Sequence, residues 1–179
     1  MIVIAARHKE ISAVVAQVPF ADGLALLTST PLKHILRLSM AALGDLSRSI
    51  IGHSPLTVPI VGPPDSCAIM NMPGSWEGYC SLLPEDTSWT NACPARAVFT
   101  TSFYRPTLYA QRVECPTLFV MADHDEVIPL WSVRREVARV PNAQVLMLSG
   151  SHFDVYKGSC FEDAIAAEQD FFVTHLQNQ

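Results

Sequence analysis

Hydrophobic residues form two strand-length runs in the last third of the chain, at residues 115–122 and 144–148. Between them, residues 130–140 carry apolar and charged side chains in a helix-like segment. The pattern therefore predicts a strand, a helix and a second strand. In such a unit the two strands are expected to pair in parallel.

Each of these runs ends in polar residues. The first run breaks into Asp123, His124 and Asp125, and the second is followed by a turn that ends at His152. Polar groups at the carboxyl ends of neighbouring parallel strands meet at one edge of the sheet. We therefore expect the Asp125 carboxylate to orient the His152 imidazole as a general base. The spacing to Pro129 favours Asp125; Asp123 is the alternative, and a turn-capping role is the competing interpretation for the aspartate.

A nucleophile to match this acid and base is missing from the sequence. A serine in such a site is carried by a Gly-x-Ser-x-Gly turn between a strand and a helix. No such pentapeptide occurs in the 179 residues, and the nearest segments, residues 74–78 and 149–151, have the wrong glycine spacing.

The rest of the chain lacks a regular strand–helix alternation. Residues 11–18 predict a strand, Pro31 opens a predicted helix over residues 32–51, and residues 161–176 predict a final helix. The middle of the chain predicts an extended run at residues 56–64, short helical pieces near Ala68 and Trp76, and a helix over residues 89–101.

Three segments in the order of a known family carry a resemblance. Residues 13–23, residues 122–129 and residues 150–156 are similar to the strand after the nucleophile helix, the acid turn and the catalytic-histidine turn. Together they resemble the C-terminal part of an α/β-hydrolase of the dienelactone-hydrolase-like and acyl-peptidase-like branch. The implied fold class is α/β, with parallel strands flanked by helices and a helical lid-like insertion. One partial domain is expected over residues 1–179, with core segments 1–23 and 113–179 and a lid at 24–112.

The resemblance implies Ser-His-Asp chemistry on a small apolar ester or thioester, with Asp125 and His152 as catalytic residues. Because the serine turn is missing, we expect a truncated hydrolase that is inactive alone unless an N-terminal half is supplied. The alternatives are a non-catalytic remnant that binds a small ligand or forms a homodimer through its open sheet edge, an acyltransferase or thioesterase of secondary metabolism, and an incorrect start at Met1.

Composition agrees with a piece of a buried sheet. Charged residues make up 16% of the chain, against roughly 25% in a typical soluble domain. Hydrophobic residues make up 49%, and the mean hydropathy is +0.23. Strands of a doubly wound sheet have cover on both faces and a neighbour at each edge, so an isolated part of one has this composition.

The net charge and the spacing of the cysteines limit which partners and cofactors are expected. The net charge of −5 argues against nucleic acid or an anionic membrane, and a cytoplasmic location is the default. The five cysteines show no Cys-x-x-Cys pair and no metal-ligand spacing, so we expect buried thiols and neither a metal nor another cofactor.

Other polar and aromatic residues are assigned structural roles. Asp22 is expected to mark a turn rather than a substrate contact. Four histidines are expected to lie on loops or polar helix faces without chemistry, and five aromatic residues are expected to form the core of the lid. These residues are His8, His34, His53 and His175, and Trp76, Trp89, Phe99, Phe103 and Tyr104.

Overall fold

A computed structural model describes residues 1–176, and the chain divides into two compact units. Unit 1 joins Met1–Asp22 to Arg105–Gln179, and unit 2 is Gly23–Tyr104. The last three residues of the predicted C-terminal core segment, 177–179, lie outside the described residues.

A three-stranded parallel sheet forms the centre of unit 1. Its order is β1 (Val14–Gln17), β4 (Thr117–Ala122) and β5 (Ala143–Leu148). Val14 lies opposite Thr117, and Thr117 in turn lies opposite Ala143. The parallel pairing of the two C-terminal strands is confirmed, as is the strand predicted near residues 11–18, which is shorter than expected.

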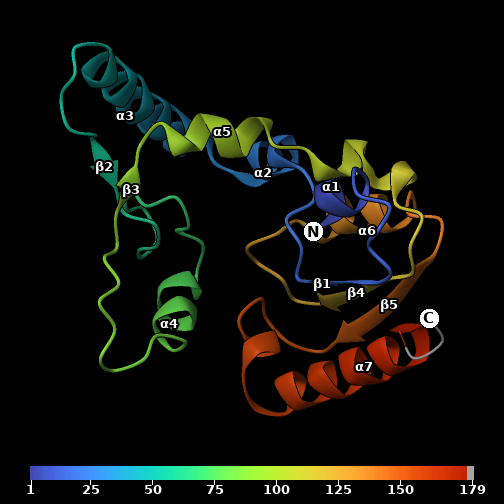
Figure 1. Ribbon diagram of the computed structural model, residues 1–179. Coiled ribbons are helices and arrows are strands. Elements are labelled where there is room, and N and C mark those ends of the chain that lie inside the picture. Colours follow the sequence, from blue (N-terminus) through green and yellow to red (C-terminus); the bar gives the residue numbers. More distant parts are fainter. Residues whose placement is uncertain (177–179) are drawn as a thin grey trace. The chain divides into compact units, whose positions relative to one another are not determined.

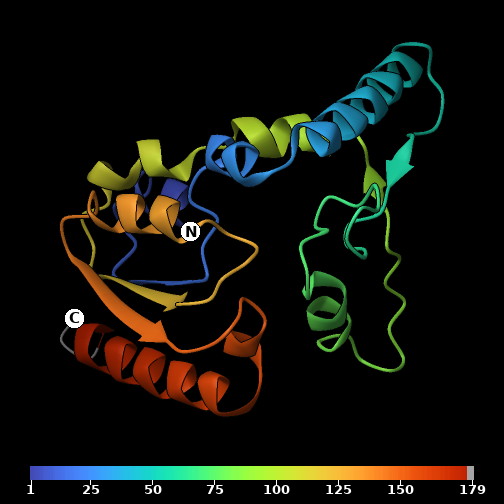
Figure 2. The same ribbon diagram turned by 180° about the vertical axis from the view of Figure 1, so that it is seen from behind.

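Helices lie on both faces of this sheet (Figures 1 and 2). The long helix α7 (Gly158–Leu176) follows one face, while α1 (Ile2–Ala5) and α6 (Leu130–Val137) lie on the other. Short 3₁₀ turns complete the unit: η1 (Pro106–Leu108), η2 (Ala110–Arg112) and η3 (Asp154–Tyr156). Covered on both sides, all six residues of β4 are buried. Every second side chain of this strand, Leu118, Val120 and Ala122, packs towards the cluster that contains Phe171 of α7.

Unit 2 is mainly helical and irregular. It contains α2 (Gly23–Ser29), α3 (Leu32–Ile50), α4 (Ser75–Cys80) and α5 (Ala97–Phe103). A two-residue antiparallel pairing joins β2 (Thr57–Val58) to β3 (Cys93–Pro94). Its apolar cluster is small, with Leu38, Val58 and Ala95 as the buried members.

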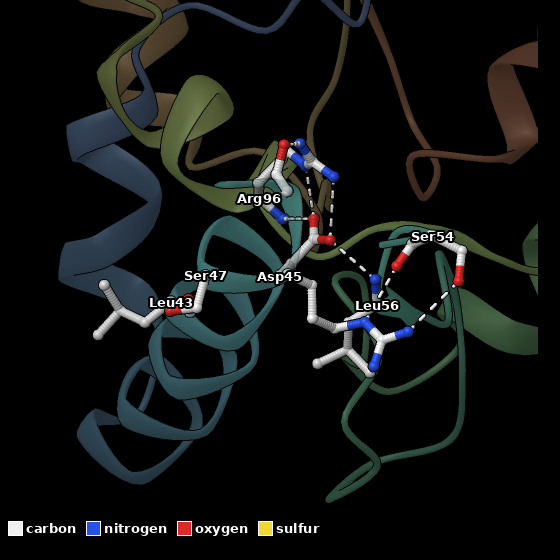
Figure 3. A network of polar contacts seen from close by, with 8 residues as sticks. Leu43, Asp45, Ser47, Ser54, Leu56 and Arg96 are labelled. Atoms are coloured by element: carbon white, nitrogen blue, oxygen red, sulfur yellow. Dashed lines mark hydrogen bonds and ion pairs between the residues drawn. The ribbon is translucent and has the colours of Figure 1, made fainter. Parts of the chain in front are cut away.

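A polar network complements this small cluster (Figure 3). The Arg96 guanidinium contacts the fully buried Asp45 carboxylate, with its Nε 2.7 Å from Oδ2. The backbone N–H groups of Leu56 and Arg96 also donate to Asp45, at 2.8 and 3.0 Å. The Arg96 side chain, first among several donors, holds the pKa of Asp45 below its usual value. One carboxylate thus joins α3 to the segment that follows it and to Arg96, which is 51 positions away.

Two predicted elements of unit 2 are wrong. No helix lies near Ala68, where the chain instead forms an isolated bridge between Val61 and Met70. The helix expected over residues 89–101 begins only at Ala97, because residues 91–94 are used by other contacts. Asn91 accepts hydrogen bonds from the N–H groups of Ile60 and Val61, and β3 follows directly.

The aromatic residues and cysteines also differ from expectation. Phe103 is 72% exposed and Trp76 is 38% exposed, so neither belongs to a lid core. Trp89 instead packs against Tyr79, with 5.1 Å between ring centroids. All five cysteines are unbridged, as expected, but each is half-buried rather than buried. Across residues 1–176, no helix has both the length and the apolar character needed to cross a bilayer.

Candidate active site

The carboxyl ends of β4 and β5 bring Asp125 and His152 together. The Nδ1 atom of His152 lies 2.8 Å from Oδ2 of Asp125. Both side chains are largely withdrawn from solvent, with 14% of the His152 side chain and 5% of the Asp125 side chain exposed. This is the juxtaposition expected from the sequence, since the two parallel strands end at one edge of the sheet.

Backbone donors fix the Asp125 carboxylate. Its Oδ1 atom accepts hydrogen bonds from the N–H groups of Val127 and Ile128, at 2.8 and 2.7 Å. These bonds close a turn before α6 and leave Oδ2 for the imidazole. Asp125 therefore combines the turn-capping role with the contact to His152, rather than performing only one of them.

Asp123, the alternative acid, does not contact His152. Its Oδ1 atom accepts from the backbone N–H of Gly150 at 3.0 Å and also pairs with the adjacent His124. The backbone N–H of His124 donates to the Gly150 carbonyl, at 3.1 Å. Asp123 thus ties the turn after β4 to the turn after β5.

The turn that carries His152 is held by residues on both sides of it. Oδ2 of Asp154 accepts from both the N–H and the hydroxyl of Ser151, at 2.9 and 2.7 Å. These donors, the Ser151 N–H first, lower the pKa of Asp154. The Gln17 side chain, at the end of β1, donates to the Val155 carbonyl at 3.1 Å.

Aromatic rings border the imidazole. Phe153 is buried and meets the His152 ring edge-on, with 5.0 Å between centroids. Tyr156 lies further away, at 6.4 Å. Burial, followed by the nearby Asp125 carboxylate, raises the pKa of Tyr156, so its hydroxyl keeps its proton at neutral pH. The imidazole is therefore bordered by one buried ring and one partly exposed ring.

The contacts from Asp154 and Gln17 were not assigned from the sequence. A Ser-x-x-Asp segment is a recognisable turn pattern, so Asp154 could have been found from Ser151 onward. The bond from Gln17 spans 138 positions and has no local signal.

Two polar residues have roles different from those expected. Asp22 forms an ion pair with Arg105, with 3.0 Å between Oδ2 and Nη2. His34, expected to be unremarkable, is 6% exposed on α3, and its Nε2 atom has no hydrogen-bond partner. Within the described part of the chain, no group of three or more His, Cys, Asp or Glu side chains is arranged to hold a metal ion.

Comparison with known proteins identifies the fold of the chain. The α/β hydrolase GrgF from Penicillium sp. sh18 superposes with a TM-score of 0.77 at 17% identity, over 98% of this chain and 60% of that chain. The chain has the fold of the α/β-hydrolase superfamily. The monoacylglycerol lipase of Paleococcus ferrophilus superposes with a TM-score of 0.64 at 21% identity, over 97% of this chain and 63% of that one.

A sequence relative extends the comparison. The quorum-quenching protein AidA of Acinetobacter baumannii is 32% identical over 167 residues. The match covers 93% of this chain and 55% of AidA, so this chain spans about half the length of that relative. No family model matches the sequence. The part of the fold in common is the C-terminal portion of an α/β-hydrolase, as the sequence predicted.

Proposed function

We propose that unit 1 provides the acid and the base of an acyl-transfer site that cleaves a small apolar ester or thioester. The observation that carries this proposal is the 2.8 Å contact between His152 Nδ1 and Asp125 Oδ2 at the carboxyl edge of an α/β-hydrolase sheet. A carboxylate on Nδ1 keeps the proton on that nitrogen and leaves Nε2 able to accept one from a nucleophile.

In the proposed reaction, a serine hydroxyl attacks the substrate carbonyl and gives its proton to Nε2 of His152. Asp125 stabilises the resulting imidazolium, and His152 then returns the proton to the departing alcohol or thiol. Water repeats the sequence to release the acid. We place the serine in the part of the fold that relatives have and this sequence does not span, because no Gly-x-Ser-x-Gly turn is present.

The test compares this chain with a form extended upstream in frame to include a serine turn. We expect ester and thioester hydrolysis from the extended form and none above background from the 179 residues alone. His152→Ala and Asp125→Asn should each lower kcat of the extended form by about 10⁴-fold or more. Since a relative is a quorum-quenching protein, the substrate panel should include quorum-sensing signal molecules.

His124→Ala is the matched control, because His124 neighbours the site but its side chain is 74% exposed and paired with Asp123. Hydrolysis that survives His152→Ala would refute the proposal. So would an equal loss in the His124 and His152 variants, since that would indicate a general disturbance of the turns.

A further inference from the structure

Unit 2 contains a cavity of about 330 Å³. Every residue that lines it belongs to unit 2, and three of them, Lys33, His34 and Arg37, lie in the first turns of α3. Its volume falls within the range of about 300–1,000 Å³ that is typical of small-molecule sites. The walls combine apolar side chains with a few polar ones, as ligand sites commonly do.

Positive charge is concentrated on one side of this cavity. Lys33 and Arg37, one helical turn apart on α3, both line it. Among the described residues, neither cation forms an ion pair; Arg37 donates only to the backbone carbonyl of Asp65, at 2.8 Å. The Asp65 side chain also lines the cavity, so the wall carries two cations and one carboxylate. This local excess of positive charge is unusual in a chain with a net charge of −5.

The N-terminus of α3 adds to the positive electrostatic potential of the cavity. The helix has 19 residues and opens at Pro31, which has no side chain able to cap it. The first backbone N–H groups of such a helix, with the positive end of its dipole, favour an anion. Pro31, Lys33 and His34 at this opening all line the cavity.

A buried histidine provides an independent sign of a ligand. His34 lines the cavity at 6% exposure, and its Nε2 atom has no partner. Nδ1 lies 3.4 Å from Nδ2 of Asn71, an amide nitrogen that can only donate. Burial, and then the charge of Arg37, lower the pKa of His34 against the opposing effect of the nearby Ala68 backbone, so the ring is neutral at pH 7. A neutral ring that accepts at Nδ1 carries its proton on Nε2. No acceptor, the Ala68 carbonyl included, meets the geometry of a hydrogen bond to that nitrogen, so a poorly satisfied buried donor lies in the wall of a cationic cavity.

We propose that this cavity binds a small organic anion through a carboxylate or phosphate head group. The head group lies at the N-terminal turn of α3, where Lys33 and Arg37 balance its charge, and one of its oxygens accepts from Nε2 of His34. The apolar part of the ligand packs on the remaining wall, formed by Pro31, Pro64, Ile69, Met72 and Pro73. No residue that lines this cavity belongs to unit 1, which carries the Asp125–His152 pair.

The experiment titrates the full chain with benzoate and, separately, with inorganic phosphate, while NMR follows the His34 ring and the Asn71 side-chain amide. We expect saturable shifts of both signals. Stronger binding of benzoate would identify a carboxylate ligand, and stronger binding of phosphate would identify a phosphoryl ligand. The neutral analogue benzamide should bind at least about tenfold more weakly than benzoate if charge is recognised.

A double variant, Lys33→Gln with Arg37→Gln, should weaken anion binding by about tenfold or more. Arg48→Gln is the matched control, because Arg48 is on the same helix but donates to Ser54 away from the cavity. The affinity of the Arg48→Gln variant for the anions should stay within about twofold of that of the unchanged protein. The proposal is overturned if neither anion shifts His34, if benzamide binds as well as benzoate, or if the Arg48 variant loses as much affinity as the double variant.

Discussion

β4 in unit 1 and α3 in unit 2 are both rich in apolar residues, but they differ in how they are covered. All six residues of β4 are buried, because helices lie on both faces of its sheet. On α3, one face buries Leu38 and Ala42, while the opposite face leaves a continuous apolar stripe exposed. The members of this stripe are Leu32, Leu36, Met40, Leu43, Leu46 and Ile50.

This contrast suggests different sources of stability. Unit 1 depends on apolar packing that is continuous from the sheet to α7. Unit 2 has a small apolar cluster and relies more on buried polar contacts such as Asp45 with Arg96. We therefore expect substitutions to have different effects in the two units, and the following tests measure that difference.

The largest effect is expected in the middle of β4. Phe119 is fully buried, so Phe119→Ala should lower the free energy of unfolding by about 3–5 kcal/mol, through lost burial and the cavity left behind. Urea denaturation followed by circular dichroism measures it. Val145→Ala on β5, where the side chain is 49% exposed, is the control and should change stability by less than about 0.5 kcal/mol. Similar losses from both would contradict the two-sided burial of β4.

A pH-dependent effect is expected from Glu136 on α6. Both of its carboxylate oxygens are buried without a partner, and burial raises its pKa from 4.5 to about 8. The folded protein thus holds a proton on Glu136 that the unfolded chain releases above pH 4.5. The destabilising contribution of Glu136 is therefore absent below pH 4.5 and grows as the pH rises to about 8. Glu136→Gln keeps the side chain neutral and should stabilise the protein by about 2–3 kcal/mol at pH 8.

Urea midpoints at pH 5, 6, 7 and 8 test this expectation, with Glu162→Gln on the exposed side of α7 as the control. The Glu136 variant should lose the decline in stability over this range, while the Glu162 variant should keep it. A Glu136 variant that is less stable than the parent at pH 8 would show that the carboxylate has a partner in solution.

A pair of glycines tests the packing of unit 2. A Cβ atom at Gly23 would lie 2.1 Å from the Thr101 carbonyl oxygen, whereas one at Gly44 would meet only Leu56, at 3.5 Å. Gly23→Ala should therefore destabilise unit 2 by about 1–3 kcal/mol, since backbone has to move. Gly44→Ala should stabilise α3 by about 0.5–1 kcal/mol. Amide hydrogen exchange in α2, α3 and α5 provides the measurement, and equal changes in β4 would mean that the two units unfold together.

The smallest effect is expected on the exposed stripe of α3. Met40 is 73% exposed, so Met40→Gln should change the free energy of unfolding by less than about 0.5 kcal/mol. Urea denaturation at two protein concentrations checks this value. A larger loss, or one that depends on concentration, would mean that the stripe is covered in solution, and would weaken the contrast with β4.

The sequence predicted unit 1 better than unit 2, for a physical reason. A continuous apolar run bounded by polar or turn residues and an amphipathic pattern with a period of 3.6 residues are both local signals, so β4, β5 and α3 could be located from the sequence. The order of these strands then placed Asp125 next to His152. Unit 2 depends on contacts such as Asn91 with Val61, which join irregular segments and leave no periodic trace.

The same limit explains the individual residues that were misjudged. His34 was assigned no chemistry because its burial depends on how α3 packs with the rest of unit 2. The sequence predicted a turn at Asp22. It gave no sign of the ion pair, because the partner, Arg105, is 83 positions away. In both cases the residue type was visible, but the contact depends on tertiary structure.

The ion pair between Asp22 and Arg105 has a consequence for how this architecture can vary. These two residues flank the segment Gly23–Tyr104. Next to them, the backbone N–H of Thr107 donates a hydrogen bond to the Ala21 carbonyl, at 3.0 Å. The two ends of the insertion are thus fastened to each other by residues of the sheet unit itself. Since the entropic cost of closing a loop grows only slowly with its length, this anchor can accept inserts of very different size. The length of Gly23–Tyr104 can therefore change without a change in the packing of the sheet unit.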